Sequence, residues 1–203
     1  MNQLNLPFMP KKIQKPRPYT DKYHVIYCDP PWDYNNRTFR NQKGNDTGAA
    51  SDHYPTMSPQ ELIDFGDKVK TICTKNCICY MWTTGPQLDI SLDVLKAWGF
   101  TYKTIAFVWE KQRTNPGYYT MSSTELCIVG TKNAIPKPRG SRNVRQFHNI
   151  PRTNKHSQKP QLFRDLIHQM HPELNKIELF ARNDDMHWDV WGFDAPTPIA
   201  LPF

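Results

Sequence analysis

Four consecutive residues, Asp29, Pro30, Pro31 and Trp32, combine groups that can bind an amine and a flat ring. The Asp29 carboxylate and the Pro30 carbonyl would be two hydrogen-bond acceptors at a fixed separation, because prolines have locked φ angles. Trp32 has an apolar face on which a nucleobase could stack, an interaction worth ~1–3 kcal/mol. This quartet therefore suits alkylation of an exocyclic base amine, a poor nucleophile whose nitrogen must be stabilised as it becomes positive.

A sulfonium methyl donor would complete this chemistry without a metal or a covalent nucleophile. Methyl transfer from sulfur is an in-line displacement, to which positioning can contribute ~7–11 kcal/mol in favourable cases. The competing interpretation is structural: the quartet is a turn that ends a strand, and Trp32 belongs to the core. The four residues alone favour neither interpretation.

The elements that position the quartet alternate between strands and helices along the chain. The predicted strands are His24–Asp29, Asn76–Thr83, Phe100–Trp109, Ser123–Gly130 and Asn175–Phe180. The predicted helices run from Ser58 to about Lys68, from Pro86 to Gly99 and from Pro160 onward. This order predicts an α/β fold with a mostly parallel sheet covered on both faces, in which the third and fourth strands form an antiparallel pair at one edge.

The first predicted helix begins with a full set of start signals. Ser58 can cap the helix, Pro59 suits its first position, and Glu61 completes a capping box with Ser58. Met57 can pack against Leu62 as a hydrophobic staple. We therefore expect the chain to leave the loop that follows the quartet at a well-defined point.

The quartet and the last predicted strand should meet at one edge of the sheet. Parallel sheets bind ligands beyond the carboxyl ends of their strands, near the point where the strand order reverses. Asp29 ends the first predicted strand and Phe180 ends the last one. If these two strands are neighbours, the residues that follow both of them share one mouth.

The length of 203 residues fits one domain, since domains commonly have roughly 100–200 residues. Residues 1–22 form a basic, proline-rich arm that we expect to be extended. Residues 23–203 would form a single domain with two long flexible loops, residues 33–54 and 131–159. Loops of this length inside a compact domain are usually functional, as a lid or a binding loop, or else disordered.

The net charge of +7 is concentrated in one segment. No Asp or Glu occurs between Leu126 and Arg164, whereas basic residues occur at Lys132, Lys137, Arg139, Arg142, Arg145, Arg152, Lys155, Lys159 and Arg164. A field of one sign favours a polyanionic partner such as nucleic acid. A solvated basic loop is the simpler alternative, but the position beside the quartet favours nucleic acid. Candidate contacts are Lys137, Arg139, Arg142 and Arg145.

The five cysteines indicate a reducing compartment rather than a disulfide framework, because their number is odd and most lie in apolar runs. Cys77 and Cys79 share a face of a predicted strand and could form a metal site with Cys73. Without a second pair at ligand spacing, buried thiols are the favoured interpretation and no metal is expected. The sequence shows no signal-peptide pattern and no apolar run near the ~20 residues that span a bilayer. We expect a cytoplasmic protein.

The wider pattern resembles the adenine-specific N(6)-methyltransferases that include the messenger-RNA m6A-writing enzymes (MT-A70-like) and their bacterial and phage relatives. Ten blocks follow the family's order between about Tyr23 and Asp194. They are Asp29–Trp32, His53–Ser58, Met81–Thr84, Ala97–Phe100, Phe107–Lys111, Gly117–Tyr119, Glu125–Gly130, His156–Pro160, Glu178–Arg182 and Trp188–Gly192. Ten blocks in order are far more specific than the quartet alone.

This resemblance implies a Rossmann-like methyltransferase fold in which the catalytic motif precedes the cofactor motif. S-adenosylmethionine would be the methyl donor. The quartet Asp29, Pro30, Pro31 and Trp32 would be catalytic, with Asp29 and Pro30 holding the amine at the methyl group. Trp32 and Tyr54 would line the base pocket.

The resemblance also implies a set of cofactor contacts. Asp29 and Lys159 would lie at the cofactor, with Lys159 near its carboxylate or ribose. Phe180, Arg182 and Asn183 would follow it beyond the last strand.

The end of the pattern departs from the family. Gly192, Phe193 and Asp194 would close the far side of the cofactor, but the family commonly has Gly-Asn-Glu or Gly-Asn-Gln at these positions. An aromatic ring cannot form the hydrogen bonds of the amide, so Asp194 could take over that contact.

Three functions agree with these residues. The first is transfer of methyl to the N(6) amine of adenine in DNA, and the second is the same reaction on RNA. The third is a non-catalytic partner subunit that binds nucleic acid, which the intact quartet argues against. The small size and short basic loop resemble the bacterial and phage members of the family, whose usual substrate is DNA, so this resemblance favours DNA. A homodimer and a heteromeric partner both remain open.

Overall fold

The computed structural model describes six parts of the chain, which are residues 17–18, 21–33, 56–117, 119–152, 158–192 and 195–202. Most of the arm expected at residues 1–22 and of the loop expected at residues 33–54 lies outside these parts. Of the loop expected at residues 131–159, all but residues 153–157 is described.

The main sheet has the strand order β6-β4-β5-β3-β2-β7-β8 in the described parts. In that order the bounds are Phe147–Asn149, Thr101–Asn115, Ser122–Lys132, Cys73–Thr83, Tyr23–Cys28, Lys176–Leu179 and Asp189–Trp191. Strand β5 runs antiparallel to both of its neighbours, and the other neighbouring pairs are parallel. The predicted α/β fold with a mostly parallel sheet and an antiparallel part is confirmed.

The short strand β6 changes one detail of that prediction. It pairs with β4, so the antiparallel pair β4 and β5 lies one strand inside the edge rather than at it. A second sheet has two parallel strands, β1 (Arg17–Pro18) and β9 (Ile199–Ala200). These strands of two or three residues are too short to show a periodic pattern in the sequence.

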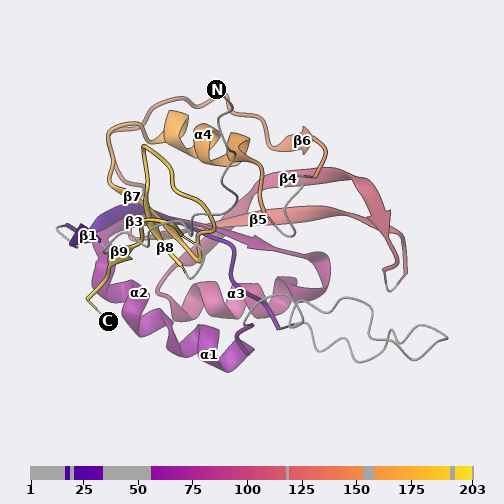
Figure 1. Cartoon of the computed structure of the whole chain (residues 1–203), viewed down its shortest axis with the longest axis horizontal. Coiled ribbons are helices and arrows are strands. Elements are labelled where there is room, and N and C mark those ends of the chain that lie inside the picture. The colour runs from indigo at the N-terminus through magenta and orange to yellow at the C-terminus, as the bar shows by residue number, and fades with distance from the viewer. Residues whose placement is uncertain are drawn as a thin grey trace, which may run out of the picture.

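Helices cover both faces of the main sheet (Figure 1). One face carries α1 (Pro59–Asp64), α2 (Gly66–Ile72) and α3 (Leu88–Ala97), and the other carries α4 (Gln161–Met170). A 3-10 turn, η2 (Gly85–Gln87), leads into α3. Among the described residues, no helix is long and apolar enough to cross a membrane.

Alternate residues of β2 enter two separate cores. Ile26 and Cys28 pack on the side of α1 to α3, whereas Val25 and Tyr27 pack on the side of α4. All four side chains are fully buried, which agrees with a central parallel strand that is covered on both faces. The five cysteines are free thiols in buried positions.

The start of α1 has the predicted capping box. The Ser58 hydroxyl accepts from the Glu61 backbone N–H at 3.3 Å, and the Glu61 carboxylate accepts from the Ser58 backbone N–H at 2.7 Å. The helix expected to continue to Lys68 is interrupted at Phe65, whose ring contacts Trp98 and Trp191. The break lets this aromatic side chain enter the core.

The capping box gives a first prediction. Ser58→Ala should lower the free energy of unfolding by ~1 kcal/mol, because an N-cap acceptor is lost. Urea denaturation would show a lower midpoint with an unchanged slope. Ser58→Thr keeps the hydroxyl and should retain most of the stability; an equal loss in both variants would contradict the capping role.

Candidate active site

The carboxyl ends of β2 and β7 lie side by side, as the sequence predicted. The two strands are parallel neighbours, and Cys28 pairs with Leu179. Asp29 and Phe180 are the next residues of each strand, so both leave the sheet at the same edge. We call this the carboxyl edge. Strand β3 runs parallel to β2 and so ends at this edge too. Strand β4 also ends there, because β3 and β4 both run antiparallel to β5.

The quartet forms a tight turn that is fixed by a neighbouring segment. The Trp32 backbone N–H donates to the Pro30 carbonyl at 2.8 Å, which places Pro31 at the centre of a three-residue turn. The φ of proline suits that position. Met57 binds the turn from outside: its N–H donates to the Pro31 carbonyl at 2.8 Å, and its carbonyl accepts from Asp33 at 3.2 Å. The capped helix α1 therefore holds the turn through Met57.

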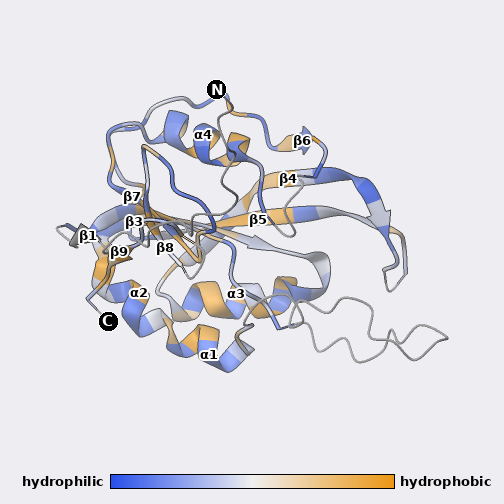
Figure 2. Cartoon of the chain, viewed as in Figure 1, coloured by the Kyte–Doolittle hydropathy of each residue, from blue (hydrophilic) through white to orange (hydrophobic). Residues whose placement is uncertain are grey.

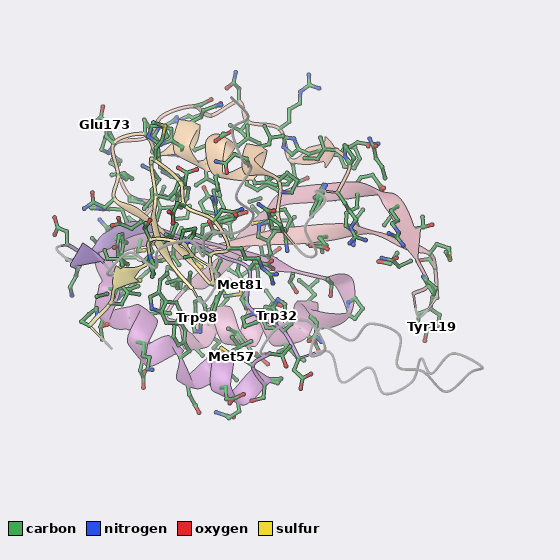
Figure 3. All side chains as sticks on the ribbon, in the orientation of Figure 1. Trp32, Met57, Met81, Trp98, Tyr119 and Glu173 are labelled. Atoms are coloured by element: carbon green, nitrogen blue, oxygen red, sulfur yellow. The ribbon has the colours of Figure 1, made fainter. Side chains whose placement is uncertain are left out.

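Trp32 lies in the core below this turn. Its side chain is 4% exposed, and its indole N–H donates to the Trp82 carbonyl at 3.1 Å. Figure 3 shows Trp32 among Met57, Met81 and Trp98, between the sheet and the helices beneath it. The expected stacking face is therefore covered in this structure, as the structural interpretation of Trp32 anticipated.

A chain of alternating charges surrounds Asp29. The Lys159 ammonium lies 2.5 Å from an Asp29 oxygen and 3.2 Å from a Glu125 oxygen. The other Glu125 oxygen lies 3.1 Å from the Lys111 ammonium. Glu125 and Lys111 were not predicted as site residues, although both belong to sequence blocks that resemble the family. We call these four residues the charge chain.

The charge chain decides the protonation of its carboxylates. Burial raises the pKa of Asp29, and the Lys159 ammonium opposes this rise. Burial also acts to raise the pKa of Glu125, but Lys159 and Lys111 together outweigh it and hold that pKa below its usual value. Asp29 keeps 18% of its side chain exposed, so it is open to a substrate while most of it is shielded from water.

Five of the eight predicted cofactor residues line one cavity at the carboxyl edge. Its walls include Asp29, Gln158, Lys159, Phe180, Arg182 and Asn183. The positive charge of Arg182 acts on Asp29 and favours its ionised form. The structure thus brings together residues from the end of β2, the segment before α4 and the loop after β7.

Phe180 and Gly192 shape the loop after β7. Phe180 has a φ of 60°, a conformation that is uncommon for a residue with a side chain and often marks functional sites. A Cβ at Gly192 would lie 2.5 Å from the Ala181 carbonyl oxygen and 2.6 Å from the Ala181 nitrogen, so only glycine fits there. Phe193, Asp194 and Tyr54 lie outside the described residues, and their predicted contacts stay predictions.

Arg164 supports the same loop from α4, which the sequence did not predict. Its guanidinium is buried, forms an ion pair with Glu178 and donates to the carbonyls of Asn183 at 3.3 Å and Asp184 at 3.5 Å. Burial raises the pKa of Glu178, which Arg164 opposes. Arg164 is one of the basic residues of the segment without Asp or Glu, but the structure places it inside.

Of the four predicted nucleic-acid contacts, the structure places Arg139 away from the site. Lys137, Arg139, Arg142 and Arg145 are all exposed. The backbone next to Arg139 is bound to the last turn of α4, through Gly140 N–H and the Met170 carbonyl at 2.9 Å. The ten residues of α4 span ~15 Å. Arg139 therefore lies near the far end of α4 from Lys159.

Comparison with known proteins agrees with this geometry. The MT-A70 family profile matches residues 23–194. The chain is 47% identical to the type II methyltransferase M.MunI of a Mycoplasma species over 186 residues, which are 86% of this chain and 78% of that protein.

More distant relatives share the domain within longer proteins. A putative N(6)-adenosine-methyltransferase MT-A70-like protein of Medicago truncatula is 27% identical over 175 residues, 82% of this chain and 25% of that protein. The human N(6)-adenine-specific methyltransferase METTL4 is 25% identical over 191 residues, 86% of this chain and 38% of that protein. The chain therefore spans well under half of these two relatives. With the profile match covering most of its length and the carboxyl edge arranged as described, the chain belongs to the MT-A70 family of methyltransferases.

Proposed function

We propose that the protein transfers a methyl group from S-adenosylmethionine to the N(6) amine of adenine in DNA. The observation that carries this proposal is the position of Asp29. Its partly exposed carboxylate lies at the end of β2, is held by Lys159, and borders the cavity lined by Arg182 and Asn183. An acceptor for an amine thus adjoins a cavity with the groups that a charged cofactor needs.

The residues present fit S-adenosylmethionine. The cofactor carries a carboxylate, an ammonium, a sulfonium and an adenosine, and it supplies a methyl group on positively charged sulfur. Lys159 and Arg182 offer cations for its carboxylate, Asp29 offers an anion for its positive end, and Phe180 and Asn183 offer an aromatic and an amide contact. These five residues would hold it.

The quartet would orient the amine of adenine. The Asp29 carboxylate accepts one amine N–H, and the Pro30 carbonyl accepts the other with the lone pair that Trp32 N–H does not use. These contacts strengthen as the nitrogen becomes positive, so they stabilise the transition state more than the ground state. The raised pKa of Asp29 suits it to receive the proton that the methylated amine releases.

Trp32 would act as a positioning residue in this mechanism. Its buried indole ties the turn to the Trp82 carbonyl, and Met57 holds the turn on its other side. The acceptor directions of Asp29 and Pro30 would then depend on Trp32 without contact between Trp32 and the base.

The choice of DNA rests on the comparisons. Identity to the type II methyltransferase is 47%, against 24–28% for relatives named as N(6)-adenosine-methyltransferases or their subunits. The alignment also covers 78% of the type II enzyme but only a quarter of the Medicago protein. RNA as substrate and a non-catalytic role in a complex are the alternatives that the assay below separates.

The main test is methylation by the purified protein with labelled S-adenosylmethionine on matched single- and double-stranded DNA and RNA. We expect N(6)-methyladenine in DNA. Asp29→Asn should lower kcat on the order of 10²–10³-fold, the range for loss of one preorganised transition-state contact. Asp21→Asn, an exposed carboxylate near the other end of β2, is the matched control.

Each alternative has its own signature in this assay. Activity on RNA alone would overturn the choice of DNA. Nucleic-acid binding without methylation of any substrate would support the partner-subunit function. Full activity of Asp29→Asn would exclude the assigned mechanism.

The charge chain predicts opposite pH shifts for two variants. Activity needs ionised Asp29, so kcat/KM should fall as the pH drops through its pKa. The Glu125 charge raises that pKa and Lys159 lowers it. Glu125→Gln should therefore move the acid limb of the pH–rate profile to lower pH, and Lys159→Met should move it to higher pH. The exposed Glu173→Gln should leave it in place; shifts of the same sign in both site variants would contradict the prediction.

Trp32→Phe separates positioning from stacking, because phenylalanine keeps a flat ring but lacks the N–H. Loss of the bond to Trp82 should cost ~1 kcal/mol of stability. A positioning role also predicts a lower kcat well below the melting temperature. Trp98→Phe loses a comparable buried bond, to the Leu62 carbonyl at 2.7 Å, and should keep its kcat. Unchanged kcat in Trp32→Phe would favour stacking.

A further inference from the structure

Strands β4 and β5 extend beyond the rest of the sheet as a two-stranded ribbon. The last β3 residue, Thr83, pairs with Leu126 of β5, and the last β6 residue, Asn149, pairs with Glu110 of β4. Beyond these pairs, β4 and β5 continue with only each other as neighbours among the described strands, up to the pair Asn115–Ser122. Figure 1 shows this ribbon projecting past the layers of helices.

The tip of the ribbon exposes two large apolar side chains. Tyr119 is 101% exposed and Met121 is 61% exposed. Figure 3 shows Tyr119 at the far end of the ribbon, away from the body of the protein. Single exposed apolar side chains are common on protein surfaces, but these two lie two positions apart at the tip of a projecting ribbon, where a contact with another molecule can bury both.

The charge of the ribbon favours a polyanion as that molecule. Between Glu110 and Glu125 the sequence has Lys111 and Arg113 and no acidic residue. Arg113 is exposed, and Figure 2 shows the outer part of β4 as hydrophilic. Lys111 is paired with Glu125, so Arg113 is the cation that the ribbon exposes. An exposed cation with an aromatic tip is a combination that proteins use on nucleic acid, a charge for phosphates and a ring for bases.

The root of the ribbon is fixed to the active site. Lys111 binds Glu125, which binds Lys159, the partner of Asp29. Gln112 has a φ of 55° and donates to the Asn149 side chain at 2.6 Å. The ribbon therefore leaves the sheet at a defined angle, from the residues that hold the catalytic carboxylate.

The reach of the ribbon matches the size of a DNA groove. Met121 is four residues from Glu125, a distance of ~13 Å along an extended strand. The major groove of B-DNA is ~12 Å wide and ~8.5 Å deep, and it admits a two-stranded ribbon. A base that is flipped into the site leaves a gap in the stack, and apolar side chains of DNA-binding proteins are known to insert between bases.

We propose that the β4–β5 ribbon holds duplex DNA beside the target adenine, with Tyr119 and Met121 against the bases next to the flipped nucleotide and Arg113 on a phosphate. This inference rests on the proposed function, since it assumes that adenine in DNA reaches Asp29. A second copy of the chain is the competing occupant of the tip.

The test compares paired and unpaired target adenines. The variant Tyr119→Ala with Met121→Ala should lose at least ~10-fold in kcat/KM on a duplex, whereas a duplex with a mismatch opposite the adenine should lose less, because an unpaired base costs little to flip. Affinity for S-adenosylmethionine, measured by calorimetry, should not change. Tyr102→Ala with Met186→Ala is the matched control, because both side chains are exposed and lie away from the ribbon tip.

Arg113 has a separate readout. Arg113→Ala should reduce the slope of log affinity against log salt by ~0.9, the value for one phosphate contact on duplex DNA. An unchanged slope would contradict the assigned contact.

Three results would overturn the ribbon proposal. They are wild-type activity of the double variant on duplex DNA, an equal loss on paired and mismatched DNA, and a loss that accompanies a change of oligomeric state in sedimentation. The last result would assign the tip to a second copy of the chain. The wild-type protein distinguishes the two failures. If it methylates no DNA, the proposed function fails; if it methylates duplex DNA and the double variant does so equally well, only the ribbon proposal fails.

Discussion

The ion pair between Asp29 and Lys159 is the contact on which the rest of the site depends. It joins the end of β2 to the segment before α4, across 130 residues of sequence. A buried carboxylate without a partner would take up a proton rather than stay charged. Lys159 supplies that partner, and its own position is fixed by the start of α4 on one side of the sheet. The chemistry at Asp29 therefore requires the complete layered fold.

The ion pair is part of a larger balance. Lys159 lies between two carboxylates, and Glu125 lies between two lysines, so each interior charge of the chain has two opposite neighbours. Removal of any one member would leave a shielded charge uncompensated. The free-energy cost of such an uncompensated charge is usually larger than the stabilisation that the intact ion pair provides. In the proposed mechanism, which needs one carboxylate at the amine, the three other ionised groups would together balance the charge of that carboxylate.

Local patterns made much of the fold predictable. The capping box at Ser58 and Glu61 spans three positions and was confirmed in full. Gly99, predicted to end a helix, follows α3 with a φ of 87°. Strand β2 was predicted within one residue at each end because its apolar run stops at the quartet. The shared mouth of Asp29 and Phe180 followed from the general behaviour of parallel sheets and needed only the pairing of β2 with β7.

What the sequence could not show depends on distant partners. Nothing near Glu125 indicates that Lys111 and Lys159 will meet it, because the first contact needs the register of β4 on β5 and the second needs the docking of α4. The basic segment has the same difficulty. The positive charge of the segment was evident from the sequence. The position of Arg139, away from the site, follows from the hydrogen bond between Gly140 and the last turn of α4. Arg164 reads as one more surface cation until β7 places Glu178 beside it.

The shared lysine also bears on how a substrate can enter. In the proposed mechanism an adenine amine and Lys159 donate to the same Asp29 carboxylate. The amine would therefore replace part of the hydrogen bonding that Lys159 now provides to Asp29. A lysine that lost its partner inside the protein would oppose this exchange. Glu125, at 3.2 Å, lets Lys159 keep an ionic contact while its bond to Asp29 lengthens. In that mechanism Glu125 would lower the free energy needed to free the Asp29 carboxylate for the amine, without contact to the reacting atoms.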